Sequence, residues 1–182
     1  NVIIQILMDL KKYIRSIPDY PKKGILFRDI TTLIKDEKAF EETINQIVER
    51  SKKFDFNKIA AIESRGFVFA SAVSYILKKP FIMLRKKNKL PSDTHSVDFE
   101  LEYGTATIEV HKDSINKNDK VLIIDDLIAT GGTAEAAAKL VKISNGNVAA
   151  FVFVINLFDL GGCKSLIEKG YKVENLIEFP GH

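Results

Sequence analysis

Cysteine is almost absent from this sequence: Cys163 is the single example among 182 residues. One cysteine cannot form an intrachain disulfide, so the fold must be stable without one. Secreted domains often depend on disulfides, and this composition therefore favours a reducing, cytoplasmic compartment. We expect Cys163 to act as a small, half-buried apolar side chain rather than as a reactive group.

Long hydrophobic runs are also missing. The longest, residues 2–4 near the start and 148–155 near the end, fall far short of the about 20 apolar residues that a membrane-spanning helix needs. The first residues lack the basic region and the small-residue cleavage site of a signal peptide. The sequence therefore predicts no membrane partner.

A strong excess of charge of one sign is the third feature that is missing. Lys and Arg total 27 and Asp and Glu total 24, which gives a formal net charge of +3. Domains that bind nucleic acid usually carry a much stronger basic surface, so we expect no nucleic-acid partner. With 46% hydrophobic and 28% charged residues, the chain has the composition of one globular domain that spans residues 1–182.

Apolar spacing predicts helices in the first third of the chain. Ile3, Leu7, Leu10, Ile14 and Ile17 recur at helical intervals, and Pro18 should end that helix. A loop should follow over residues 18–28. A second helix is expected over residues 36–53, with Asp36 as its N-cap and with Phe40, Ile44, Ile47 and Val48 facing inward.

Strands and helices then alternate, which is typical of a doubly wound α/β domain. Strands are predicted at residues 58–63, 80–84, 121–124 and 148–157, and helices at 66–77 and 132–143. The strands are continuous apolar runs, as expected of parallel strands covered on both faces. Residues 97–102 and 105–111 instead alternate polar and apolar, which predicts an inserted hairpin. The predicted fold class is α/β, with a mostly parallel twisted sheet flanked by helices.

The stretch VLIIDDLIATGGT, residues 121–133, carries the strongest functional signal. It puts Asp125 and Asp126 at the carboxyl end of a strand, the edge at which open α/β sheets bind ligands. The Thr-Gly-Gly-Thr turn that follows opens a helix. Its glycines let several backbone N–H groups point to one centre, and the helix N-terminus adds partial positive charge. This turn therefore predicts a phosphate site.

The acidic pair needs a different ligand, because carboxylates repel phosphate. Sugar hydroxyls suit Asp125 and Asp126, since a carboxylate can accept from two neighbouring OH groups. The stretch then predicts a site for ribose 5-phosphate. It has neither the Gly-Lys-[Ser/Thr] of a P-loop nor the three spaced glycines of a dinucleotide site. The alternative is a capped strand end with two solvated acids.

A second strand also ends in a small polar turn, at Glu63, Ser64, Arg65 and Gly66. The Arg65 guanidinium can bind two phosphate oxygens together, and the amides that open the next helix can add to it. The alternative is an N-capped helix with a Glu–Arg pair at the surface. Two such turns on one sheet favour a ligand that is held at both ends.

These residues resemble the type I phosphoribosyltransferases, and within them the enzymes that act on adenine. The VLIIDDLIATGGT stretch matches the signature of that superfamily. The further matches are GILFRDI at residues 24–30, ESRGF at 63–67, RKKNKLP at 85–91 and LEYG at 101–104. The resemblance covers residues 17–157.

The resemblance implies a role for each matching residue. The 5-phosphate would be bound by Ala129, Thr130, Gly131, Gly132 and Thr133. The ribose hydroxyls would be bound by Asp125 and Asp126. Pyrophosphate would be bound by Glu63, Ser64, Arg65, Gly66, Arg85, Lys86 and Lys89. In the family, the turn that matches residues 63–66 often contains a non-proline cis peptide. Adenine would be bound by Phe27, which stacks on the base, and by the backbone of Leu26 and Arg28.

The resemblance also implies a catalytic residue and a lid. Glu102 would move a proton on the purine, and Tyr103 would cover the site. Residues 1–35 would form a helix and a hood over the base, and residues 85–112 a basic loop and hairpin lid. Mg²⁺ would be the cofactor, carried by the substrate rather than by a protein metal site. The enzyme would be a homodimer in which the lid serves partly the neighbouring subunit.

Two alternatives stay open for the base-binding residues and the lid. Phe27 is otherwise an ordinary core residue, and the basic loop and Glu102 are otherwise solvated surface. Asn88 stands where the family commonly has glycine, although asparagine tolerates the left-handed backbone better than most residues. His95 and His111 lack the spacing of metal ligands, and we expect them at the surface.

The resemblance implies the reaction of adenine with phosphoribosyl pyrophosphate to give AMP and pyrophosphate. One alternative is an enzyme of the same class that uses hypoxanthine, guanine or xanthine. The other is a non-catalytic regulator that senses phosphoribosyl pyrophosphate and binds nucleic acid, against which the small net charge argues.

Overall fold

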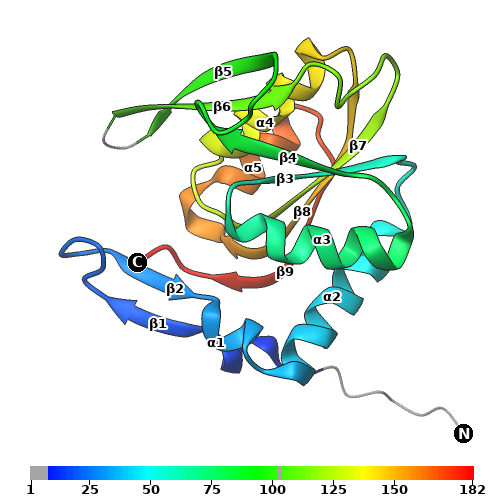
Figure 1. Cartoon of the computed structure of the whole chain (residues 1–182). Helices are drawn as coiled ribbons and strands as arrows, with labels where there is room; N and C mark the ends of the chain where they lie inside the picture. The colour runs from blue at the N-terminus through cyan, green and yellow to red at the C-terminus, as the bar shows by residue number, and fades with distance from the viewer. Residues whose placement is uncertain (1–7, 102–103) are drawn as a thin grey trace, which may run out of the picture.

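The computed structural model describes residues 8–101 and 104–182, and it has a single large sheet with helices on both faces (Figure 1). The strands are β1 Arg15–Pro18, β2 Leu26–Asp29, β3 Lys58–Ile62, β4 Phe81–Lys86, β5 Thr94–Leu101, β6 Gly104–His111, β7 Lys120–Ile128, β8 Asn147–Leu157 and β9 Val173–Phe179. The helices are α1 Thr31–Ile34, α2 Glu37–Ser51, α3 Arg65–Leu77, α4 Gly132–Ile143 and α5 Gly162–Glu168, with short 3-10 helices at Leu10–Tyr13 and Phe158–Leu160.

The large sheet has the strand order β5-β6-β4-β3-β7-β8-β9. The five strands from β4 to β9 in this order are parallel, and β6 runs antiparallel to both β4 and β5. The predicted fold class, a mostly parallel sheet flanked by helices, is confirmed. Strands β1 and β2 form a separate two-stranded sheet.

Two hydrophobic clusters cover the two faces of the sheet. Leu122 and Ile124 of β7 pack in the cluster that includes residues of α2 and α3. Val121 and Ile123 pack in the cluster that includes residues of α4 and α5. Because side chains alternate along a strand, both faces of β7 are buried, which explains its unbroken aliphatic run.

The predicted helix that ends at Ile17 is wrong. Leu10–Tyr13 form only a 3-10 helix, and Arg15–Pro18 form a strand in which Ile17 pairs with Phe27. Pairing with β2, which lies in the predicted loop over residues 18–28, overrides the helical spacing. The predicted helical residues Ile3 and Leu7 lie outside the described residues.

Most of the other predicted elements are confirmed. Helix α4 has the predicted bounds, and α2 begins after Asp36, whose side chain accepts a hydrogen bond from the Ala39 amide at 2.9 Å. Strand β7 is longer than predicted, because it continues through both acidic residues to Ile128. Along the described parts of the chain, no helix is both long and apolar enough to cross a membrane.

Candidate active site

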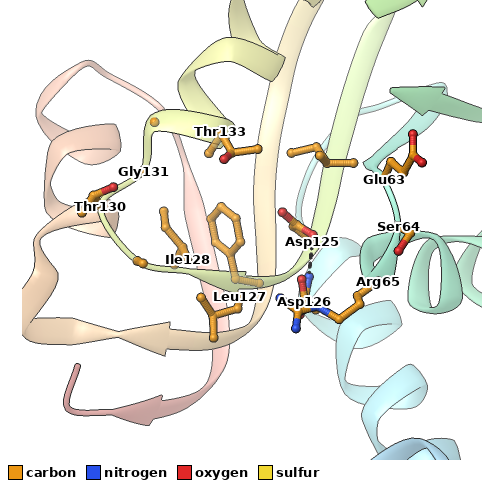
Figure 2. Close-up of a pocket in the computed structure, with 15 residues that line it drawn as sticks. Glu63, Ser64, Arg65, Asp125, Asp126, Leu127, Ile128, Thr130, Gly131 and Thr133 are labelled. Carbon is orange, nitrogen blue, oxygen red and sulfur yellow. Dashed lines mark hydrogen bonds and ion pairs between the residues drawn. The ribbon is translucent and has the colours of Figure 1, made fainter. Parts of the chain in front are cut away.

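The acidic pair and the glycine turn lie at the carboxyl end of β7. The strand runs through Asp125 and Asp126, the turn follows at residues 129–131, and α4 begins at Gly132. Gly131 has φ +93°, a left-handed conformation that favours glycine. This conformation brings the chain directly into α4, whose first amides have no partner within the helix (Figure 2 shows the turn beside the helix start).

The second turn lies at the carboxyl end of β3, the strand next to β7. Strand β3 ends at Ile62 and α3 begins at Arg65, with a cis peptide between Glu63 and Ser64. Because β3 and β7 are parallel, with Ala61 paired to Ile124, both turns reach the same edge.

A cavity of about 260 Å³ lies between the two turns. Figure 2 shows the turn with Thr130 and Gly131 on one side, Glu63 and Ser64 on the other, and Asp125 between them. The cavity is lined by Ile62, Glu63, Ser64, Arg65, residues 125–134 and Phe153. The glycine turn, the acidic pair and the residues Glu63, Ser64 and Arg65 therefore surround one space, whereas Arg85, Lys86 and Lys89 do not line it.

Asp125 is packed closely against the second turn. A Cβ atom built on Gly66 would lie 2.8 Å from Asp125 Oδ1 and 3.1 Å from the Ile124 carbonyl oxygen. Only glycine at position 66 allows α3 to begin this close to the carboxylate. The Asp125 Oδ1 atom also accepts a hydrogen bond from the Asp126 amide at 2.9 Å. Burial, and next the charge of Asp126, raise the pKa of Asp125 well above its ordinary value.

Asp126 is buried and faces Arg65. The Arg65 Nε atom lies 2.8 Å from Asp126 Oδ2, but the pair is an ion pair rather than an aligned hydrogen bond, since Oδ2 accepts no hydrogen bond from any described residue. Burial raises the pKa of Asp126, and the Arg65 charge opposes that rise. Hydrogen-bond donors from a ligand would therefore stabilise the charged form of both carboxylates.

Arg65 also connects the acidic pair to the two-stranded sheet. Its guanidinium carbon lies 5.4 Å from the centre of the Phe27 ring, which is half-buried and packs edge-on against Tyr20 with the ring centres 5.2 Å apart. Leu26 is also half-buried. The Arg28 side chain instead points to Ser16 and to the C-terminal segment. The aromatic ring predicted for the base therefore lies beside the residue predicted for pyrophosphate.

The basic segment 85–89 is attached to the second turn through Glu63. The Glu63 carboxylate accepts a hydrogen bond from the Lys86 amide at 3.0 Å and two from the Arg85 guanidinium, at 3.3 and 3.4 Å. The Lys86 amide above all, and then Arg85, lower the pKa of Glu63 despite partial burial. Arg85 also donates to the Lys89 carbonyl oxygen at 3.2 Å. Lys86 and Lys89 themselves are exposed.

Asn88 keeps the turn that a glycine would form there. It has φ +65°, and its amide donates to Glu109 Oε2 at 3.0 Å. The Glu109 side chain, which is buried, also accepts from Ser96 Oγ at 3.2 Å. The basic segment is therefore tied to the β5–β6 hairpin as well as to Glu63. His111 belongs to the same region, where its Nε2 atom accepts from the Ser92 amide at 3.3 Å.

Glu102 and Tyr103, the predicted catalytic residue and lid residue, lie outside the described residues. The hairpin that leads to them passes beside the glycine turn, since a Cβ built on Gly132 would lie 3.4 Å from the Glu100 carbonyl oxygen. A second cavity of about 480 Å³ adjoins the first and shares Ile62, Glu63 and Thr133 with it. Its other walls are Lys86, Lys87, Phe99, Leu101 and residues 105–108.

The sequence analysis missed Gly162, at the start of α5. Its amide donates to the Ala129 carbonyl oxygen at 3.0 Å, and a Cβ atom built on it would lie 2.4 Å from that oxygen and 2.9 Å from the Gly131 nitrogen. The glycine turn is thus held in place by a residue that lies 33 positions after Ala129. The adjacent glycines Gly161 and Gly162 are visible in the sequence, but their role depends on the tertiary contact with the glycine turn, which the sequence does not show.

Within residues 8–101 and 104–182, no group of three or more His, Cys, Asp and Glu side chains could hold a metal ion. The cavity is lined by two adjacent carboxylates, and the buried Oδ2 atom of Asp126 accepts no hydrogen bond from the described residues. Such a donor set suits a metal ion that brings most of its ligands with the substrate.

The chain is similar to known phosphoribosyltransferases over nearly all its length. A family model described as the phosphoribosyl transferase domain matches residues 30–179. A curated adenine phosphoribosyltransferase of Pelagibacter ubique is 82% identical over 175 residues, which are 96% of this chain and 100% of the relative. A solved adenine phosphoribosyltransferase of Thermoanaerobacter pseudethanolicus has 46% identity and a TM-score of 0.91, and the match covers 95% of this chain and 99% of that one.

A further solved structure contains ligands. It is the adenine phosphoribosyltransferase of Saccharomyces cerevisiae, in complex with an imino-altritol bisphosphate and adenine. It has 33% identity and a TM-score of 0.84, and the match covers 92% of this chain and 96% of that one.

Proposed function

The chain belongs to the phosphoribosyltransferases, and specifically to the adenine phosphoribosyltransferases, and on that premise we propose how its residues carry out the reaction. The enzyme transfers the 5-phosphoribosyl group from phosphoribosyl pyrophosphate to adenine, which gives AMP and pyrophosphate in purine salvage. The observation that supports the assignment of roles is the convergence of two anion-binding turns and an acidic pair on one cavity.

The glycine turn, residues 129–133, binds the 5-phosphate. Its amides stand at the N-terminus of α4, a helix of 12 residues, where the helix dipole favours an anion. The hydroxyls of Thr130 and Thr133 add two donors that rotate to suit the phosphate.

Asp125 and Asp126 bind the ribose 2- and 3-hydroxyls. Each hydroxyl donates to a carboxylate whose pKa is raised in the ligand-free protein. Donors stabilise the charged form of a carboxylate, so sugar binding lowers both pKa values and offsets part of the cost of burial. The acidic pair thereby selects a sugar ring over a bare phosphate.

The second turn, residues 63–66, binds the pyrophosphate end through Ser64, Arg65 and Gly66. Arg85, Lys86 and Lys89 supply positive charge to the leaving group. Glu63 does not face the anion itself: it holds Arg85 and Lys86 in place through the hydrogen bonds described above. Lys86 and Lys89 are free to reach the ligand because they are exposed.

Adenine binds between the two-stranded sheet and the ribose site. Phe27 stacks on the base, and the backbone of Leu26 and Arg28 reads its edge, where a 6-amino group and a 6-oxo group differ as donor and acceptor. The adenine found in the yeast relative is consistent with a base site in this fold. Arg65 lies between this site and the acidic pair, so it aligns both substrates.

Mg²⁺ would be the cofactor, held mainly by the oxygens of phosphoribosyl pyrophosphate, and Asp125 and Asp126, which line the cavity, would be the protein carboxylates that assist in holding it. It supplies charge neutralisation on the diphosphate. No residue cluster of the described chain competes with the substrate for it.

The chemical step joins adenine N9 to C1 of the ribose while the bond from C1 to the pyrophosphate oxygen breaks. The ring carries positive charge in the transition state, and the surrounding acids stabilise it. Glu102 takes the proton that adenine loses when N9 bonds to carbon, and Tyr103 covers the site. The electron pair of the broken bond leaves with pyrophosphate, beside Arg65 and Arg85.

Glu102→Gln is expected to lower kcat at least tenfold and to change either KM by less than threefold, since general acid–base groups contribute about 10²–10⁴-fold. Steady-state kinetics with both substrates varied measure the two effects. Glu100→Gln, two residues earlier in the chain, is the control and should behave as wild type. A rise in KM at constant kcat would make Glu102 a binding residue only.

We propose a single domain over residues 1–182, in which residues 1–35 form the hood over the base and residues 85–112 the lid. A cytoplasmic location is supported by the single cysteine. A homodimer is supported by an apolar surface on α3 and β4, made of Val68, Tyr75, Ile76 and Met83, which are 37%, 75%, 46% and 45% exposed. The three α3 residues share one helix face, and the ring contact of Phe67 with Phe81 holds that helix against β4.

The double substitution Tyr75→Glu with Ile76→Glu is expected to convert a dimer to a monomer, because it puts two charges into an apolar interface. Light scattering after size exclusion measures the mass. Tyr75→Phe, which keeps the apolar ring, should leave the dimer intact. A wild-type protein with the mass of one chain would contradict the proposal.

An assay with adenine, phosphoribosyl pyrophosphate and Mg²⁺ tests the function. We expect AMP formation, and slower formation of IMP, GMP or XMP from hypoxanthine, guanine or xanthine. Equal or faster turnover of a 6-oxopurine would overturn the choice of base. Binding of phosphoribosyl pyrophosphate without turnover, together with salt-dependent binding of nucleic acid, would instead indicate a regulator.

A further inference from the structure

The Arg28 side chain points away from the cavity although it neighbours Phe27. Its Nη1 atom donates to Ser16 Oγ on β1, its Nη2 atom donates to the Pro180 carbonyl oxygen at 3.0 Å, and its guanidinium carbon lies 4.4 Å from the centre of the Phe179 ring. The residue is 8% exposed. A buried guanidinium with these contacts holds the two-stranded sheet to the C-terminal segment, residues 179–181.

The two-stranded sheet needs such an attachment. A two-stranded sheet by itself is at best marginally stable in water, so its position depends on what it packs against. Phe27 lies on β2, next to Arg28, and its ring therefore moves with this sheet. Figure 1 shows the C-terminus beside β2.

The C-terminal segment is in turn attached to the chain that supports the glycine turn. The Gly181 amide donates to Asp159 Oδ1 at 2.6 Å, and a Cβ atom built on Gly181 would lie 2.6 Å from the Leu160 side chain. Two residues after Leu160, Gly162 donates to the Ala129 carbonyl oxygen at 3.0 Å.

These contacts form one continuous connection. It runs from the proposed base site through Arg28, Phe179–Gly181 and residues 159–162 to the proposed 5-phosphate site. The connection is made of protein atoms alone, so it exists before either substrate binds. The positions of its residues set the distance between the Phe27 ring and the turn that holds the phosphate.

We propose that Arg28 is a positioning residue: its side chain clamps the two-stranded sheet onto the C-terminal segment and so places adenine N9 in line with C1 of the bound ribose. This inference rests on the proposed function. It assigns to the side chain a role separate from the contact that the Arg28 backbone makes with the base. Because a displacement of about 1 Å at reacting atoms can cost about 10²-fold in rate, a clamp outside the cavity is enough to control the reaction.

Arg28→Met tests the proposal, because methionine keeps the apolar stem and removes every donor. We expect kcat/KM for adenine to fall by about 10- to 100-fold and KM for phosphoribosyl pyrophosphate to stay within twofold. Arg28→Lys keeps a single donor group, the ammonium, and the charge over the Phe179 ring, and it should restore part of the loss. A chain that ends at Phe179 lacks the Pro180 acceptor and should reproduce the adenine defect.

Lys11→Met is the matched control, since Lys11 Nζ lies 5.2 Å from the centre of the same Phe179 ring. Lys11 is exposed, and among the described residues it makes no side-chain contact with the two-stranded sheet. It should have wild-type kinetics. In the double variant, Arg28→Met combined with the shortened chain, the losses should be less than additive, because both changes break one connection.

Two results would overturn the proposal. One is wild-type adenine kinetics in a folded Arg28→Met protein. The other is an equal loss for both substrates together with a lowered melting temperature, which would make Arg28 merely structural. The shortened chain decides the matter if Arg28→Met does not fold: normal adenine kinetics there would refute the clamp. Failure of the proposed function is a different result, since the wild-type enzyme would then make no AMP.

Discussion

Asp125→Asn is expected to lower kcat/KM more than tenfold and, at the same time, to raise the melting temperature of the ligand-free protein. The loss of activity follows from the weaker grip on the ribose hydroxyls, because a charge-assisted hydrogen bond is worth about 1.5–3 kcal/mol. Asparagine has nearly the same shape, and its Oδ1 atom can still accept from the Asp126 amide, which is 2.9 Å from the aspartate oxygen.

The gain in stability follows from the raised pKa of Asp125. Between the ordinary pKa of an aspartate, about 3.9, and the raised value, the folded protein binds a proton that the unfolded chain does not bind. Stability therefore falls as the pH rises through this window, and the loss persists above it. Asparagine carries no charge and avoids the loss. The difference in melting temperature between the variant and wild type should be small below pH 4 and should grow toward neutral pH.

Thermal unfolding from pH 4 to pH 8, with kinetics at neutral pH, measures both effects. Asp55→Asn is the control, because Lys120 lowers the pKa of the exposed Asp55, the opposite of the shift at Asp125. Removing the Asp55 charge should therefore not stabilise the protein. Full activity of Asp125→Asn, or a melting temperature that falls at neutral pH, would refute the role of this carboxylate.

Gly162→Ala is expected to lower kcat/KM for phosphoribosyl pyrophosphate about 100-fold. The new Cβ atom would lie 2.4 Å from the Ala129 carbonyl oxygen and 2.8 Å from the Ile128 side chain, so the glycine turn must move. A shift of about 1 Å in a group that positions a substrate can have this effect on the rate. Overpacking of this kind also costs about 1–3 kcal/mol of stability.

Gly170→Ala separates the two effects of a glycine substitution. Gly170 has φ +86°, so alanine is strained there by about 1–2 kcal/mol, but no described atom lies within 4 Å of the new Cβ. This control should lose stability and keep the activity. If Gly162→Ala is likewise only less stable, with KM for phosphoribosyl pyrophosphate unchanged, then the glycine turn does not hold the 5-phosphate.

The elements that the sequence predicted well are those with strong local signals. Helix α4 follows a glycine turn and carries an alanine-rich apolar face, and strands β3, β7 and β8 are continuous apolar runs. The second turn begins where the apolar run of β3 meets Glu63, whereas the run of β7 meets Asp125 within the strand and the glycine turn follows Ile128. Their meeting at one edge follows from the parallel sheet alone.

The features that sequence reasoning missed depend on partners far away in the chain. The helical spacing around Ile17 gave the wrong element because its partner, Phe27, forms a strand only through that pairing. Gly162 acquires a function only through its contact with the turn at Ala129. The Arg28 side chain meets Pro180, 152 positions later, and no local pattern indicates that contact.

The ion pair of Arg65 with Asp126 is a further example. Both residues were predicted for the site, Arg65 for the pyrophosphate and Asp126 for the ribose, and their contact at 2.8 Å was not anticipated. It arises because α3 begins against β7, where Gly66 leaves room for Asp125.

A crystal structure of this protein with phosphoribosyl pyrophosphate and Mg²⁺ tests the central claim most directly. We predict one ligand molecule that spans both turns, with its 5-phosphate on the amides of residues 130–133, its hydroxyls on Asp125 and Asp126, and its diphosphate beside Arg65. A ligand whose 5-phosphate lies away from the glycine turn, or whose hydroxyls do not touch either aspartate, would contradict it.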